Sequence, residues 1–121
     1  MVYRSRFEET IAKSLHDKGV DFEYETLKVS YVSAHKYTPD IIIRNSDGSI
    51  KHIIELKGRF TASDRSKHIQ IRKQHPDIDI KFVFMNANVK LHKASKTTYS
   101  MWAEKHGFTW SNKVIPDEWL S

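Results

Sequence analysis

Residues 37–58 read YTPDIIIRNSDGSIKHIIELKG, two apolar runs joined by a polar segment. The runs at 37–44 and 50–57 have the length and the isoleucine content that are typical of strands. Asp47-Gly48 between such runs is a strong signal of a β-hairpin, because both residues suit the tight turn that it needs. The sequence therefore predicts an antiparallel hairpin here.

Two carboxylates face each other in this hairpin. If the loop has two residues, Asp40 pairs with Glu55. The same register pairs Arg44 with Lys51. Directly opposed like charges are destabilising, so a compensating group is needed. Mg²⁺ is a suitable one because it prefers oxygen ligands. Lys57 lies two residues beyond Glu55 and therefore adds a cation on the same face of the strand.

A different loop would change this arrangement. A three-residue loop or a bulge slips the register by one and moves one carboxylate to the other face. A four-residue loop at 45–48 keeps the face but offsets the pairing. As an alternative without metal, Asp40 caps a turn after Pro39, and Glu55 belongs to an ordinary exposed strand edge.

The flanking sequence predicts helices and further strands. Ser5 and Glu8 have the spacing of a capping box, and Gly19 supplies a stop, so a helix is expected at 6–18. Also expected are strands at 20–25, 27–31 and 79–85, a helix at 63–75 capped by Ser63 or Asp64, a helix from Thr97 or Thr98 to 106, and a turn at 115–120. A helix links two strands that would then be parallel. The expected fold class is α/β (α+β), with a central mixed β-sheet flanked by helices.

Length and composition narrow the function. The 121 residues fit one domain, 1–121. Twenty Lys and Arg against fifteen Asp and Glu give a formal charge of +5, which favours a polyanionic partner. The absence of cysteine excludes disulfides, thiol nucleophiles and cysteine-based metal sites. The apolar runs are too short for a membrane helix, and the start lacks the apolar stretch of a secretory signal. A soluble cytoplasmic protein with no membrane partner is expected.

Basic side chains concentrate in the segment 57–73, where six Lys and Arg stand against Asp64 alone. The segment 80–103 has no acidic residue at all. This half of the chain is the candidate phosphate-facing surface. The residues expected to bind DNA are Arg59, Arg65, Lys67, Arg72 and Lys73.

Pro39-Asp40 and Glu55-Leu56-Lys57 together have the form that marks the PD-(D/E)xK nuclease superfamily, which this chain resembles. The chemistry of such a site is that of phosphodiester hydrolysis. A metal neutralises the anionic phosphate, lowers the pKa of its bound water and orients that water. A lysine can hold the nucleophile or oppose the developing charge.

A closer resemblance rests on longer segments. They are 19–25 (GVDFEYE), 37–40 (YTPD), 55–58 (ELKG), 64–68 (DRSKH) with 71–76 (IRKQHP), and 104–107 (EKHG) with 115–119 (IPDEW). In these segments the chain resembles phage endonuclease I, the Holliday-junction resolvases of the T-odd bacteriophages, over nearly its whole length. The resemblance implies a restriction-endonuclease-like core and a Mg²⁺-dependent endonuclease, with Mn²⁺ able to substitute. It implies cleavage of four-way and other branched DNA junctions that leaves 5′-phosphate and 3′-hydroxyl ends, in the cytoplasm of a bacterial host.

The resemblance also implies roles for individual residues. Asp40 and Glu55 bind the metal, and the backbone carbonyl of Leu56 adds a ligand. Glu8 completes the acidic site, and Lys57 acts on the nucleophile or the transition state. The role of Glu8 in the site competes with its role as a capping-box partner, because a carboxylate bound to a backbone N–H has less freedom to bind metal.

Family members are intertwined homodimers, which implies that about residues 1–32 are exchanged and about 37–121 carry the catalytic hairpin. Glu8 would then join Asp40 of the partner subunit. The connection at 33–36 is shorter than the bridge of that family, and the turn at 45–49 is longer. Two other functions remain open: a PD-(D/E)xK nuclease that acts on unbranched DNA, and a junction-binding module that does not cleave.

Overall fold

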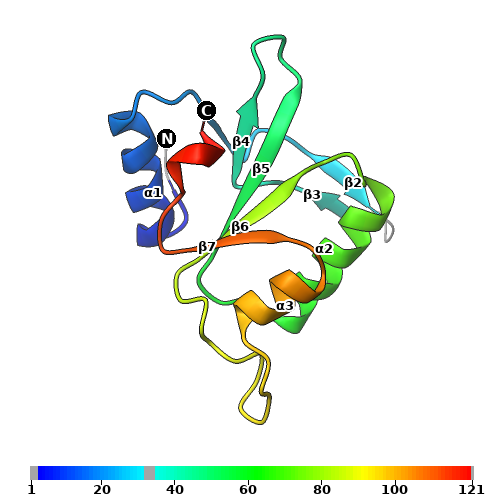
Figure 1. Cartoon of the computed structure of the whole chain (residues 1–121). Helices are drawn as coiled ribbons and strands as arrows, with labels where there is room; N and C mark the ends of the chain where they lie inside the picture. Colours follow the sequence, from blue (N-terminus) through cyan, green and yellow to red (C-terminus); the bar gives the residue numbers. More distant parts are fainter. Residues whose placement is uncertain (1–2, 32–34, 121) are drawn as a thin grey trace.

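The computed structural model describes residues 3–31 and 35–120. The elements in this part of the chain are α1 (Arg6–Asp17), β1 (Glu23–Tyr24), β2 (Val29–Tyr31), β3 (His35–Tyr37), β4 (Ile41–Arg44), β5 (Ile50–Lys57), α2 (Ala62–Gln74), β6 (Ile80–Phe84), α3 (Tyr99–Lys105), β7 (Thr109–Asn112) and the 3₁₀ turn η1 (Asp117–Trp119) (Figure 1). Residues 32–34, at the boundary expected for an exchange between protomers, lie outside the described residues.

The main sheet has five strands in the order β1-β4-β5-β6-β7. Its β1/β4 and β4/β5 pairs are antiparallel, whereas β5/β6 and β6/β7 are parallel. The helix α2 links the parallel neighbours β5 and β6, as expected. The predicted α+β class with a central mixed sheet is therefore confirmed. The strands β2 and β3 form a separate antiparallel pair.

Each face of the main sheet packs against different helices (Figure 1). On one face, Ile11 of α1 packs with Ile54 of β5 and with Trp119 of η1. On the other face, Ile71 of α2 packs with Ile53 and with residues of α3. Because successive residues of a strand point to opposite faces, Glu55 shares the face of Ile53 and points toward α2.

The hairpin of β4 and β5 differs from the prediction at its tip. The expected two-residue loop is wrong: the Asn45 N–H donates to the Ser49 carbonyl at 2.8 Å, which leaves three residues in the loop. Gly48 has a φ of 89°, a conformation that glycine adopts without the Cβ penalty. Consequently Arg44 pairs with Ile50 and not with Lys51.

A β-bulge next to this loop restores the predicted register. The pairing shifts between Ile43 and Arg44, so that Lys51 is the extra residue on β5. Beyond the bulge Ile43 pairs with His52, and Ile41 with Ile54, as expected. The loop and the bulge each slip the pairing by one residue in opposite senses, and the two slips cancel. Asp40, just before Ile41, therefore lies beside Glu55.

Helix starts are set by side chains that accept backbone N–H groups. The Ser5 hydroxyl accepts the Glu8 N–H at 3.1 Å, which confirms the predicted start of α1. The expected reciprocal bond is absent there, because the Glu8 carboxylate accepts the Arg4 N–H and not the Ser5 N–H. In α2 the predicted cap is wrong: Thr61 caps the helix, and Asp64 is its capping-box partner.

Thr61→Ala is expected to lower the free energy of unfolding by about 1 kcal/mol, because the helix loses the hydroxyl that accepts its Asp64 N–H. Urea unfolding measures the loss. Ser63→Ala is the matched control, since Ser63 is an exposed residue of the same helical turn. Equal effects of the two substitutions would contradict the assignment of Thr61 as the cap.

Two further differences concern strands. The predicted strand at 37–44 breaks into β3 and β4 at Thr38–Asp40, because Pro39 has no N–H to donate to a sheet. The edge strand β7 was not predicted, since its sequence, TWSN, has little apolar pattern and is mostly exposed. None of the helices within 3–31 and 35–120 combines the length and the apolar character needed to cross a membrane.

Candidate active site

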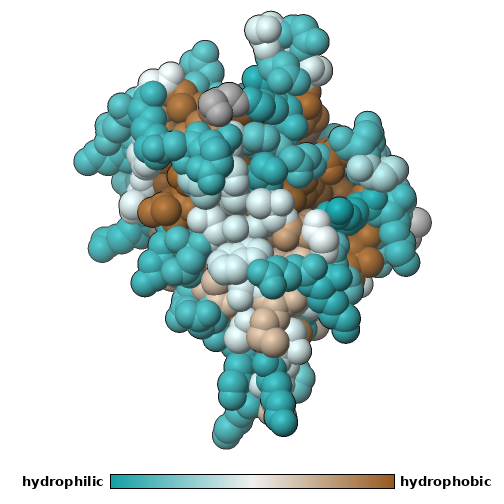
Figure 2. Space-filling view, viewed as in Figure 1, coloured by the Kyte–Doolittle hydropathy of each residue, from teal (hydrophilic) through white to brown (hydrophobic). Residues whose placement is uncertain are grey.

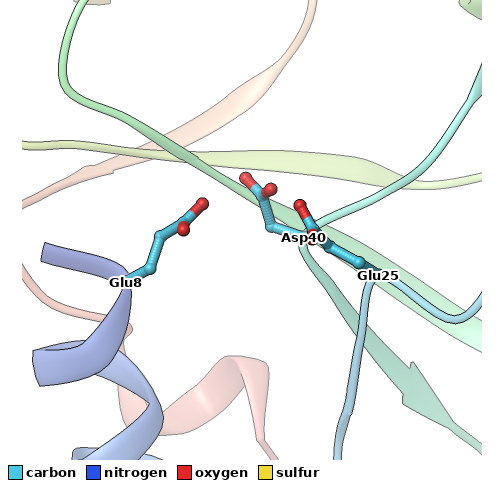
Figure 3. Close-up of side chains that lie close together, drawn as sticks. All are labelled: Glu8, Glu25 and Asp40. Atoms are coloured by element: carbon cyan, nitrogen blue, oxygen red, sulfur yellow. The ribbon is translucent and has the colours of Figure 1, made fainter. Parts of the chain in front are cut away.

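Three carboxylates from distant parts of the chain meet at one end of the main sheet. Glu8 comes from the first turn of α1, Glu25 follows β1, and Asp40 precedes β4. Their nearest oxygens lie within 4.8 Å of one another, and Figure 3 shows the three side chains pointing toward a common space. Glu8 and Asp40 are only 7% and 4% exposed. The structure thus brings together two of the predicted site residues and adds Glu25.

Glu8 is held by neighbours from its own N-terminal segment. The Tyr24 hydroxyl donates to Glu8 Oε1 at 2.6 Å. The Arg4 backbone N–H donates to the same oxygen at 3.0 Å. Both bonds use Oε1 and leave Oε2 facing the Arg4 guanidinium in the cluster. Glu8 can therefore bind its own N-terminal segment and also take part in the site.

The Asp40 and Glu55 carboxylates each accept a backbone N–H from the segment that carries the other. The Asp40 N–H donates to Glu55 Oε2 at 2.9 Å, and the Leu56 N–H donates to Asp40 Oδ2 at 2.9 Å. Burial, together with the charge of Glu55, raises the pKa of Asp40 to about 8. Burial also pushes the pKa of Glu55 upward, but His68, Lys57 and the Asp40 N–H outweigh it and hold that pKa below its ordinary value.

Glu25 was missed by the sequence analysis, which assigned it only to the strand expected at 20–25. Its backbone has a φ of 54°, uncommon for a residue other than glycine, which turns the chain at the end of β1. The Glu25 N–H donates to the Asp40 carbonyl at 3.3 Å. The left-handed turn and this bond place its carboxylate beside Asp40. Nothing in the spacing of Asp21, Glu23 and Glu25 signals this turn.

Arg4 places a positive charge among these carboxylates. Its Nη2 lies 2.6 Å from Glu25, 3.3 Å from Asp40 and 3.7 Å from Glu8. The side chain of Arg4 is nevertheless 66% exposed. An exposed ion pair of this kind contributes little stability. The guanidinium thus contacts the same oxygens that a metal ion bound by this cluster would contact.

Lys57 lies at the end of β5 with its side chain only 12% exposed. Its Nζ is 3.7 Å from Glu55 Oε1 and 3.8 Å from Asp64 Oδ1. The structure thus places Lys57 on the Glu55 side of the site, as the period of the strand predicts. A largely desolvated ammonium beside two carboxylates is suited to interact with an anionic phosphate.

The donor set fits a hard divalent cation. Carboxylate oxygens are the ligands that Mg²⁺ prefers. Burial first, and then the charge of Glu55, disfavour the charged form of Asp40, and a bound cation would favour it. The predicted ligands Asp40, Glu55 and the Leu56 carbonyl remain a prediction. The tight cluster consists of Asp40, Glu8 and Glu25, with Glu55 one hydrogen bond away from it.

Arg4→Gln is expected to increase the affinity of the DNA-free protein for Mn²⁺ by up to about tenfold, since removal of a surface ion pair frees on the order of 1 kcal/mol. Calorimetric titration measures it. Arg6→Gln, at an exposed position of α1, is the matched control because it removes the same charge. An unchanged or weaker affinity in Arg4→Gln alone would show that the guanidinium does not compete for this space.

In metal-free buffer, Asp40→Asn is expected to gain stability over the parent protein as the pH rises from about 4 to 8. The pKa of Asp40 is about 8 in the folded chain, against about 3.9 when unfolded. In this window the folded state binds more protons, so its stability falls as the pH rises, and asparagine removes that loss.

Tm values measured with a chelator at about pH 5 and about pH 8 test this pH dependence. Asp47→Asn is the control: hydrogen bonds from Ser49 lower the pKa of Asp47, so it is ionised in both states at these two pH values and its effect on stability should not change between them. A stability difference between Asp40→Asn and the parent that does not widen with pH contradicts the raised pKa of Asp40.

The five predicted DNA-binding residues differ in their surroundings. Arg59, Arg72 and Lys73 are exposed, whereas Arg65 and Lys67 are half-buried. Arg65 donates to the Phe60 carbonyl at 2.8 Å, and Arg72 lies over the Phe108 ring at 4.7 Å. These two side chains therefore also serve the packing of α2. Lys67 lies 3.9 Å from Asp64, which places it beside Lys57 and the acidic site.

A second basic surface is the loop between β6 and α3. It projects from the body of the molecule (Figure 1), and hydrophilic side chains cover its outer part (Figure 2). The loop carries Lys90, Lys93 and Lys96 and no acidic residue. The loop begins next to the site, since the Met85 N–H donates to the Lys57 carbonyl at 2.9 Å.

Comparison with known proteins decides the family. The family model for phage endonuclease I matches residues 1–121. The chain belongs to the phage endonuclease I family. This confirms the resemblance and the nuclease class that it implied. A curated member, Endonuclease I of Escherichia phage T7, is 44% identical over 121 residues, which cover 98% of this chain and 78% of that protein.

A second member of the phage endonuclease I family gives the same result. Endodeoxyribonuclease 1 of Enterobacteria phage T3 is 43% identical over 117 residues, which cover 94% of this chain and 74% of that protein. The chain therefore matches most of the length of both relatives. Both relatives thus support the prediction that this protein is a phage endonuclease.

Proposed function

We propose that this chain is a metal-dependent endodeoxyribonuclease that cuts four-way (Holliday) and other branched DNA junctions by phosphodiester hydrolysis, with 5′-phosphate and 3′-hydroxyl ends. Mg²⁺ is the proposed cofactor, and Mn²⁺ substitutes for it. The observation that carries the proposal is the convergence of Glu8, Asp40, Glu55 and Lys57 at one end of the sheet in a member of an endonuclease family.

Asp40, Glu55 and Glu8 are the side chains proposed to hold the metal, with the Leu56 carbonyl as a further ligand and Glu25 beside them. A bound Mg²⁺ would neutralise a phosphate oxygen and lower the pKa of a bound water. The hydrogen bonds to Glu8 and Asp40 fix the direction of their free oxygens. The protein thus binds the ion with few freely rotating ligands, which favours a defined geometry.

Lys57 is proposed to act on the reacting phosphate. Its ammonium is held between Glu55 and Asp64 and is shielded from water, so its charge is little screened. It either orients the nucleophile or stabilises the charge that develops on the phosphate oxygens. In the proposed hydrolysis the oxygen of water bonds to phosphorus and becomes part of the 5′-phosphate, the bond from phosphorus to the 3′ oxygen breaks, and that oxygen takes up a proton from solvent to give the 3′-hydroxyl.

DNA binding is proposed to depend on phosphate contacts. The exposed residues Arg59 and Lys73 and the loop lysines 90, 93 and 96 offer positive charge without an evident base-reading helix. Such binding reads backbone position and shape and weakens steeply with salt. This agrees with recognition of branched DNA rather than of a base sequence.

The protein is also proposed to act as an intertwined homodimer. Glu8 and Glu25 both belong to the segment before residue 32. Within that segment the Tyr24 hydroxyl donates a hydrogen bond to Glu8. An exchange of this segment would move these groups as one unit and form each site from two chains. The β2–β3 pair would then open.

Cleavage of a four-way junction and of a linear duplex with the same arms, each with Mg²⁺, tests the proposed substrate. We expect cuts near the branch point and little cutting of the duplex. Sequence-dependent cuts in the duplex would instead indicate a nuclease of unbranched DNA. Metal-independent junction binding without any cleavage would indicate a binding module.

A further inference from the structure

His68 is a fully buried imidazole behind the candidate site. It lies on α2 with no exposed surface. Its ring meets Tyr37 at 5.3 Å and Phe82 at 5.0 Å, both edge to face, and Phe60 lies at 6.5 Å. Among the described residues, neither ring nitrogen of His68 has a partner in good hydrogen-bond geometry. A buried polar group of this kind costs about 1–3 kcal/mol, so an apolar side chain would fill the same space more favourably.

A carboxylate oxygen of Glu55 lies close to this ring. The Nε2 of His68 lies 3.4 Å from Glu55 Oε1. The other oxygen of Glu55 already accepts the Asp40 N–H. Glu55 itself is only 2% exposed, so water does not cover Oε1. Glu55 Oε1 therefore has two neighbours, the His68 ring and the Lys57 ammonium.

Tyr37 supports the same picture. Its hydroxyl is buried and, within the described part of the chain, has no hydrogen-bond partner. Burial and then the charge of Glu55 raise the pKa of Tyr37, which places its hydroxyl in the field of that carboxylate. A neutral imidazole carries one N–H, and Nε2 is the ring nitrogen that faces the Glu55 carboxylate. His68 and Tyr37, two polar side chains that pack against each other, thus both lie near Glu55.

We propose that His68 is a positioning residue that donates its Nε2–H to Glu55 Oε1 and thereby fixes the orientation of the Glu55 carboxylate beside Asp40. This inference rests on the proposed function for the role of Glu55 and extends it to a residue that does not touch DNA or metal. The Nε2–H tautomer leaves Nδ1 among the aromatic rings. Without the bond, Glu55 Oε1 would lose a donor and the carboxylate could turn toward Lys57.

Two substitutions separate positioning from packing. His68→Gln keeps an N–H donor at a similar reach, and His68→Leu removes it with an apolar side chain. Loss of a residue that orients a metal-site ligand typically costs about 10–100-fold, and we expect a loss of kcat in this range for His68→Leu with KM within about twofold. His68→Gln is expected to recover most of the rate. Ile71→Val, at a fully buried position one turn along α2, is the packing control and should keep its kcat.

A measurement on the metal-free protein tests the hydrogen bond without any cleavage. Nitrogen NMR of the imidazole is expected to show His68 neutral and protonated at Nε2, with a resonance that shifts when Glu55→Gln is introduced. This result is independent of whether the protein cuts junctions, so a failure of the proposed function would leave it standing. Protonation at Nδ1, a resonance insensitive to Glu55→Gln, or full activity in His68→Leu would overturn the inference. If His68→Leu does not fold, His68→Gln and the spectrum still decide it.

Discussion

Asp40→Asn is expected to lower Mg²⁺-dependent cleavage of a four-way junction by at least about 1000-fold. The side chain lies at the centre of the site, between the Leu56 N–H and the cluster with Glu8. Loss of a metal ligand forfeits several kcal/mol of transition-state stabilisation, and about 4 kcal/mol corresponds to this factor. Asparagine has nearly the same shape, and it removes a carboxyl group whose charged form is disfavoured by burial and by the charge of Glu55. The fold should therefore persist.

Junction affinity should change by less than about threefold in the same variant, because phosphate contacts and not carboxylates supply the binding energy. Single-turnover cleavage, and binding measured with Ca²⁺, separate the two effects. Asp47→Asn is the matched control, since it makes the same chemical change at the exposed tip of the same hairpin. Equal losses in both variants, or loss of binding in Asp40→Asn, would contradict the assigned site.

A mixture of two inactive variants is expected to regain activity if the sites are composite. Glu8→Ala and Lys57→Ala each disable both sites of a homodimer. In a heterodimer with exchanged N-terminal segments, one site combines an intact Glu8 with an intact Lys57. After joint refolding about half of the dimers are heterodimers with one active site each, so about a quarter of the parent nicking rate should return.

The measurement is the nicking of a four-way junction by the refolded mixture, with each variant alone as the baseline. Heterodimers must be shown to form by differently sized tags. The matched control mixes Asp40→Asn with Lys57→Ala, because both residues lie after residue 37 and an exchange cannot separate them. No recovery with Glu8→Ala, once heterodimers are shown to form, would mean that each chain forms its own site. Recovery in the control mixture would contradict the exchange at residues 1–32, because it requires Asp40 and Lys57 of one site to come from different chains.

The sequence predicted most of the fold because its strongest signals are local. The capping residue Ser5 and the stop at Gly19 bound α1, and the apolar runs mark β5 and β6. The hairpin is instructive in another way. Its loop length was wrong, yet Asp40 still lies beside Glu55 because the bulge at Lys51 cancels the slip. A local sequence pattern does not predict a bulge. The bulge follows from tertiary packing, because the pairing that it restores keeps the isoleucine side chains of the two strands buried.

The parts of the site that were missed depend on tertiary contacts. Glu25 enters the site through a left-handed backbone turn that no residue type in its segment requires. Arg4 reaches the cluster because α1 packs across the end of the sheet. His68 was hidden in a basic helix, where its neighbours in sequence indicate a surface position. Only the packing of α2 on β5 shows that its ring is buried against Glu55.

The central claim is that side chains from α1 and from the hairpin hold one divalent cation. Anomalous diffraction from crystals soaked with Mn²⁺ tests it most directly. The expected result is a manganese peak bound by oxygens of Asp40 and Glu8, with the Arg4 guanidinium moved out of the cluster. Saturating Mn²⁺ that leaves no peak there, with Arg4 still paired to Glu25 and Asp40, would contradict the claim.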